Sequence, residues 1–66
     1  MRTVFNEVPD GGYFYAGGCD YQKISGYKYE VGGRAILLKD ENGNSPSMKT
    51  ETCFRADHPV IYKEQK

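Results

Sequence analysis

The chain has 66 residues, 38% of them hydrophobic, and its nine Lys and Arg side chains balance nine Asp and Glu side chains. This length predicts one small domain, residues 1–66, with a thin core and no room for a second domain. The balanced charge disfavours a partner that is recognised mainly through neutralisation of phosphates.

The segments rich in Tyr, Phe, Val, Ile and Thr are short and are separated by Gly and Pro. Such segments are typical of β-strands, and none shows apolar residues repeated at helical spacing over several turns. We expect these segments to form five to six strands. In chain order the segments are Thr3 to Phe5, Gly12 to Ala16, Cys19 to Ser25, Tyr27 to Val31, Arg34 to Lys39, Met48 to Phe54 and Val60 to Lys63.

The breaks between these segments have the chemistry of turns. Pro9 to Gly12 predicts a tight turn, because Pro fixes φ and Gly permits positive φ. Gly17-Gly18 and Gly32-Gly33 each fit a two-residue hairpin loop. Asp40 to Pro46 predicts a longer polar loop, and Arg55 to Pro59 an irregular or 3-10 turn.

Alternation along the strands predicts which side chains point inward, since successive residues face opposite sides of a sheet. Phe14 and Ala16 share one face, and Tyr13 and Tyr15 share the other. We expect the core to be closed near the C-terminus by Phe54, Val60 and Tyr62. The fold class predicted is all-β: a small, SH3-like, strongly twisted barrel or sheet of five to six strands with a short 3-10 turn.

Residues able to support catalysis or metal binding are sparse. His58 is the only histidine and lies in a predicted turn, and Cys19 and Cys53 show no metal-ligand spacing with it. Asp40 and Glu41 are adjacent carboxylates, but they fall in a polar loop, where exposure to water explains them without a catalytic cleft. We therefore expect no enzyme, no metal and no cofactor.

The location of the protein follows from two absences in the sequence. No apolar run approaches the roughly 20 residues that cross a bilayer, and the first residues lack the apolar region of a signal peptide. We expect a cytoplasmic protein without a membrane partner. In that compartment Cys19 and Cys53 are expected to be reduced thiols.

Tyrosine is the most suggestive residue type, with six copies interleaved with Lys and Arg. Tyr and Arg lead the residues that dominate protein interfaces, because a rigid amphipathic ring buries much area at little entropic cost. Six tyrosines do not all fit inside so small a core. The predicted partner-binding residues are Tyr13, Tyr15, Tyr27, Tyr29, Lys28 and Arg34.

The opening Phe5-Asn6-Glu7-Val8-Pro9-Asp10-Gly11-Gly12-Tyr13-Phe14, followed by Gly17-Gly18, Tyr21 and Lys23, resembles a group of small phage- and prophage-encoded proteins. Their opening reads F-x-D/E-V/L-P-x-G-x-x-F, followed by a glycine turn and Y-x-K. The resemblance implies a small β-barrel in a size class that includes inhibitors of bacterial defence such as anti-CRISPR proteins. It carries no catalytic residues.

Three functions therefore stand side by side. The first is a protein-binding module, a phage accessory protein that inhibits a host enzyme or a defence complex. The second is a nucleic-acid-binding barrel in which the tyrosines stack single-stranded bases and Lys23, Lys28, Arg34 and Lys39 follow the backbone. The third is a phage structural component or a homo-oligomer whose exposed strands pair edge to edge.

Overall fold

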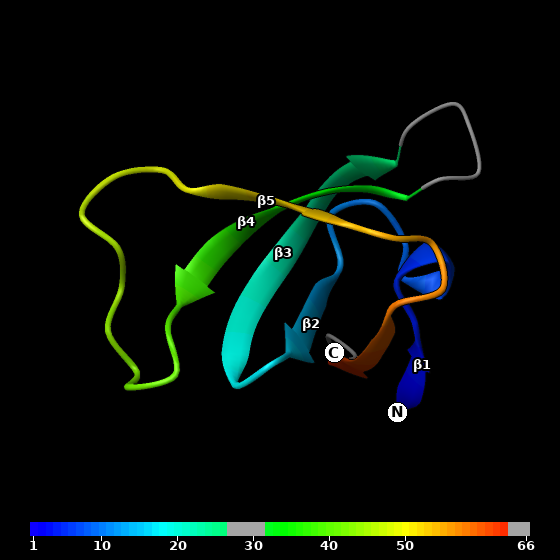
Figure 1. Cartoon of the computed structure of the whole chain (residues 1–66), viewed down its shortest axis with the longest axis horizontal. Helices are drawn as coiled ribbons and strands as arrows, with labels where there is room; N and C mark the ends of the chain where they lie inside the picture. Colours follow the sequence, from blue (N-terminus) through cyan, green and yellow to red (C-terminus); the bar gives the residue numbers. More distant parts are fainter. Residues whose placement is uncertain (27–31, 64–66) are drawn as a thin grey trace.

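The structure is a computed structural model of the chain and describes residues 1–26 and 32–63. One six-stranded sheet and one short 3-10 helix make up its regular structure (Figure 1). The elements are β1 (Arg2–Val4), η1 (Phe5–Glu7), β2 (Tyr13–Ala16), β3 (Cys19–Gly26), β4 (Gly33–Lys39), β5 (Glu51–Phe54) and β6 (Pro59–Lys63). The all-β prediction is confirmed.

All neighbouring strands are antiparallel, and their order across the sheet is β1-β6-β2-β3-β4-β5. Strands β2 to β5 form a meander, and β6 returns to pair with β2. Strands β5 and β6 are far apart in this order, yet a single turn connects them, in which the His58 amide donates to the Arg55 carbonyl at 3.1 Å. The sheet is therefore strongly curled, and Figure 1 shows β5 crossing over the meander before the chain turns into β6.

The core lies on the inner side of this curled sheet and is largely aromatic. Phe14 is fully buried, and its ring centroid lies 5.5 Å from that of Phe5 and 5.3 Å from that of Phe54. The residues that form the core are Phe5, Val8, Phe14, Ala16, Ala35 and Val60, with Tyr21, Phe54 and Tyr62 packed against them. The predicted inward positions of β2 and of the C-terminal segment are confirmed.

Phe5 does not end a strand, so the predicted Thr3–Phe5 strand is wrong at this residue. It begins the 3-10 helix, donates its amide to the His58 carbonyl at 2.9 Å and places its ring in the core. Lys23 of β3 packs beneath this helix and is only 5% exposed. Its ammonium donates to the carbonyl oxygens of Val8 at 2.7 Å and Phe5 at 3.3 Å, and lies 4.7 Å from the Phe5 ring centroid.

Two of the predicted glycine turns are confirmed and one is wrong. Gly17-Gly18 joins β2 to β3 as a two-residue loop, and the Gly12 amide closes the preceding turn on the Pro9 carbonyl at 2.9 Å. Gly33, however, is a strand residue that pairs with both Gly26 and Phe54. Gly32 is needed for close backbone approach, since a Cβ on it would lie 1.8 Å from the Phe54 carbonyl oxygen.

The remaining differences concern strand length and coverage. The predicted Met48–Phe54 strand begins only at Glu51, and Met48 is 77% exposed. The predicted 40–46 loop is confirmed; its first residue, Asp40, accepts the amides of Asn42 and Asn44 on one carboxylate oxygen. The predicted strand from 27 to 31 lies outside the described residues. In the part of the chain that the structure describes, no helix is long and apolar enough to cross a membrane.

Candidate partner-binding face

The outer face of β6, β2 and β3 carries the first two predicted tyrosines. Because Phe14 and Ala16 point into the core, Tyr13 and Tyr15 point outward. We call the outward cluster on these three strands the tyrosine face, and it consists of Tyr13, Tyr15, Asp20, Gln22, Ile61 and Lys63. The register brings residues from far-apart segments into one surface.

An exposed apolar pair lies at the middle of the tyrosine face. Tyr15 on β2 is directly opposite Ile61 on β6, and the two side chains are 38% and 42% exposed. Directly opposed side chains on neighbouring antiparallel strands have Cβ atoms about 5 Å apart, so this pair presents one continuous apolar patch. Sequence reasoning missed Ile61, because only the pairing of β6 with β2 places it beside Tyr15.

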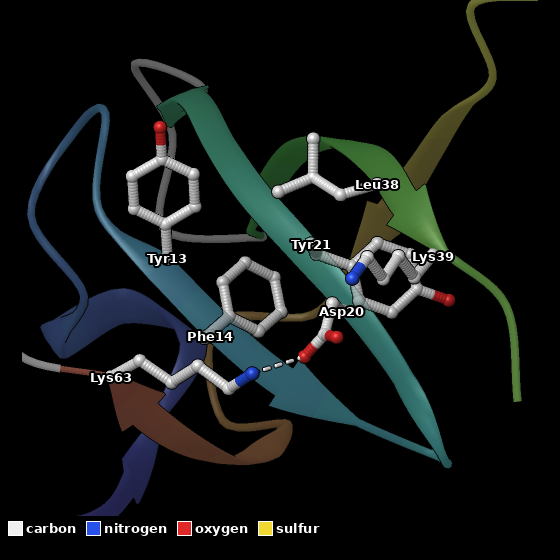
Figure 2. A pocket seen from close by; sticks show the side chains of 7 residues that line it. All are labelled: Tyr13, Phe14, Asp20, Tyr21, Leu38, Lys39 and Lys63. Atoms are coloured by element: carbon white, nitrogen blue, oxygen red, sulfur yellow. Dashed lines mark hydrogen bonds and ion pairs between the residues drawn. The ribbon is translucent and has the colours of Figure 1, made fainter. Parts of the chain in front are cut away.

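Charged groups border this apolar pair. Lys63, opposite Tyr13 on β6, extends its ammonium across β2 to the carboxylate of Asp20 on β3, as Figure 2 shows. The same ammonium lies 5.9 Å from the Tyr15 ring centroid. An exposed ion pair contributes only about 0–1 kcal/mol to stability, so its main effect here is to hold the long Lys63 side chain beside Tyr15.

A hollow of about 250 Å³ opens next to the ion pair (Figure 2). A β-bulge creates its shape, since Tyr21 pairs with Leu37 and Asp20 with Lys39, which leaves Leu38 as the extra residue on β4. The hollow is lined by Tyr13, Phe14, Asp20, Tyr21, Leu38, Lys39 and Lys63. It therefore combines aromatic and aliphatic walls with two ammonium groups.

Arg34, the third predicted binding residue that the structure describes, is not brought to this cluster. Arg34 is exposed on β4, near the other end of the sheet, where its guanidinium lies 3.3 Å from the Glu51 carboxylate. Tyr27, Lys28 and Tyr29 lie outside the described residues. Of the three predicted residues that the structure describes, it thus brings Tyr13 and Tyr15 together and leaves Arg34 apart.

Lys23 was expected to follow a nucleic-acid backbone in the alternative function, and this expectation is wrong. Its ammonium is buried against the carbonyl groups of Phe5 and Val8, at the two ends of the 3-10 helix, and is out of reach of a ligand. The two cysteines are not joined to each other: Cys19 lies opposite the buried Ala16, whereas the exposed Cys53 lies opposite Arg34. Within the described ranges, no group of three or more His, Cys, Asp or Glu residues could hold a metal ion.

Tyr21 lines the hollow on one side and packs against the core on the other. Burial raises the pKa of its phenol, the neighbouring Cys19 thiol group raises that pKa further, and a hydrogen bond with Thr52 acts in the opposite direction. The folded state therefore favours the neutral phenol, which stacks on Phe14 at a centroid distance of 5.4 Å.

This shift predicts an alkaline loss of stability. Tyr21 has an ordinary pKa of 10.0 when unfolded, so its contribution is fully present below that pH and is lost as the pH rises through the higher folded value. Urea unfolding at about pH 8 and about pH 11 should show a smaller loss for Tyr21→Phe than for the wild type. An equal loss in both proteins would show that Tyr21 ionises no less readily in the folded state.

Comparison with known protein families, with curated proteins and with solved structures found no match for this chain.

Proposed function

We propose that this protein is a non-enzymatic binding module that docks a partner protein on its tyrosine face. The observation that carries the proposal is the exposed Tyr15–Ile61 pair at the middle of the sheet, bordered by Tyr13 and the Lys63–Asp20 ion pair. An apolar, aromatic centre with a polar rim is the usual anatomy of a protein interface.

The size and rigidity of the sheet also support this function. A standard interface takes about 800 Å² from each partner, and the folded chain exposes 4802 Å² in total, so one face of the sheet is large enough. The tyrosine face is built on strands, and β2 is paired on both sides. Its side chains are therefore held in place before binding, which lowers the entropic cost of association.

The resemblance of the N-terminal segment to small phage proteins suggests the kind of partner. On that basis we propose a phage-encoded accessory protein that binds and inhibits a host enzyme or a bacterial defence complex in the cytoplasm, as anti-CRISPR proteins do. Inhibition by occlusion needs only a well-packed surface on the small protein. It needs no catalytic group.

A nucleic-acid partner is the weaker alternative. Of the cations expected to follow a nucleic-acid backbone, Lys23 is buried and Arg34 is paired with Glu51. Lys28 lies outside the described residues, so within residues 1–26 and 32–63 only Lys39 of these four cations is left to neutralise phosphates. A homo-oligomer would use the strands at the two ends of the sheet, β1 and β5, instead of the tyrosine face.

The test is partner capture with a tagged chain from bacterial lysate, in one arm treated with nuclease and in the other untreated. The double variant Tyr15→Ala, Ile61→Ser should lose the captured protein, with a decrease in affinity of about tenfold or more, because both side chains lie at the centre of the contact. Met48→Ser is the matched control, since Met48 is also exposed but lies in the loop before β5.

Three results would contradict the proposal. The first is equal capture by the double variant and the wild type while circular dichroism shows that both are folded. The second is capture that depends on intact nucleic acid. The third is self-association: the tagged chain captures only other copies of itself, and the double variant still has a mass above that of a monomer.

A further inference from the structure

We infer that the hollow beside the tyrosine face is a carboxylate pocket, which takes the side chain of a glutamate from the partner protein. The inference rests on the proposed function, because it specifies the chemistry that such a partner presents next to Tyr15. Four observations carry it: the volume of the hollow, its walls, its charge and the position of Lys39.

The volume and walls fit a side chain with an aliphatic body. The hollow of about 250 Å³ lies between the side chains of Tyr13 and Leu38, above the fully buried Phe14. Leu38 lies there only because the bulge in β4 inserts it between two paired residues. Methylene groups that enter the hollow exchange water for contact with these walls, which is favourable.

The charge of the hollow fits an anion. Two ammonium groups, those of Lys39 and Lys63, face one carboxylate, that of Asp20, which leaves one positive charge in excess. Asp20 already accepts a hydrogen bond from Lys63. Lys39 lies opposite Asp20 on β4 and has no ion pair within residues 1–26 and 32–63. An incoming carboxylate would bind the Lys39 ammonium and leave the existing pair intact.

The balance of charges in the hollow also favours a carboxylate over a phosphate. One unmatched ammonium complements one negative charge, whereas a phosphate carries more charge and needs several donors, for which Lys63 would have to leave Asp20. The phenol of Tyr21, whose pKa burial raises, stays neutral near pH 7 and adds no competing charge. A cationic side chain would meet two like charges.

The experiment is an NMR titration of the ¹⁵N-labelled full chain with small probes: benzoate, benzamide, benzylammonium and inorganic phosphate. Benzoate should shift the amide signals of Asp20, Leu38 and Lys39 and bind at least tenfold more tightly than the other three probes. Lys39→Met should weaken benzoate binding roughly tenfold, because one hydrogen bond to a charged group is lost. Lys49→Met, which removes an exposed charge in the loop before β5, should leave it unchanged.

The carboxylate inference is overturned if benzamide binds as tightly as benzoate, if phosphate competes with benzoate on equal terms, or if Lys39→Met has no effect. Partner capture separates this failure from failure of the proposed function. If the double variant Tyr15→Ala, Ile61→Ser loses capture while Lys39→Met captures the partner fully, the carboxylate inference is rejected and the proposed binding face is retained. Benzoate binding as expected, with full capture by the double variant, would remove the proposed function.

Discussion

Phe14→Ala is expected to leave most of the protein unfolded at room temperature. Phe14 has no exposed surface and contacts three other rings, those of Phe5, Tyr21 and Phe54. Removing such a ring from a core costs about 3–5 kcal/mol, through lost burial and the cavity that remains. The whole free energy of unfolding of so small a domain is only a few kcal/mol, so the two quantities are of similar size.

The measurement is urea unfolding followed by circular dichroism, with Phe14→Leu as a graded variant. Leucine keeps part of the volume, so its midpoint should fall between those of the wild type and Phe14→Ala. Met48→Ala is the matched control, because Met48 is 77% exposed and its change should stay within about 0.5 kcal/mol. A Phe14→Ala protein with the wild-type midpoint would show that the aromatic cluster is not what stabilises the fold.

The division of β2 into an inner and an outer face could be predicted from sequence, because alternation is a local property. Phe14 and Ala16 are buried, while Tyr15 on the other face is exposed. The Gly17-Gly18 hairpin was predictable for the same reason, since two adjacent glycines satisfy a two-residue turn with positive φ. Local chemistry thus determines β2 and β3 as a unit.

The composition of the tyrosine face could not be predicted, because it depends on which strands become neighbours. Ile61 and Lys63 alternate outward on β6, but they join the tyrosines only because β6 returns to pair with β2. Strand periodicity carries no information about this long-range pairing. The same applies to the hollow, which depends on a bulge that leaves Leu38 without a partner on β3.

The exposed apolar side chains at the centre of the tyrosine face are not explained by the stability of the fold. Tyr15 and Ile61 remain in water on a sheet whose opposite side buries its apolar side chains well. Isolated exposed apolar residues are common, but two directly opposed on neighbouring strands form one exposed apolar patch, which lowers solubility. Such local exceptions tend to fall at functional sites, which agrees with the binding role proposed for this face.

Lys23 is the other side chain whose position the sequence pattern does not reveal. Lys23 lies two residues after Tyr21 and so shares its face of β3, but lysine is among the residues least often buried, which gave no reason to expect it in the core. Its stem passes under the 3-10 helix, and its ammonium reaches two carbonyl groups that the short helix leaves without strand partners. Lys23 therefore links the N-terminal segment to the sheet.

Lys23→Met should lower the free energy of unfolding by about 1–3 kcal/mol, which is the cost of leaving a buried acceptor without its donor. The Phe5 carbonyl still accepts the Val8 amide at 3.1 Å, so the loss falls mainly on the Val8 carbonyl, which has the shorter bond to Lys23. Methionine keeps most of the apolar stem, so lost packing contributes little.

Two measurements test this expectation. Urea unfolding should show a lower midpoint for Lys23→Met and almost none of that decrease for Lys49→Met, which removes an exposed charge. Hydrogen exchange should quicken at the amides of Phe5 and Val8 more than along β2 and β3, because the change releases the 3-10 helix first. A higher midpoint would mean that removing the cost of burying the ammonium outweighs the loss of its two hydrogen bonds.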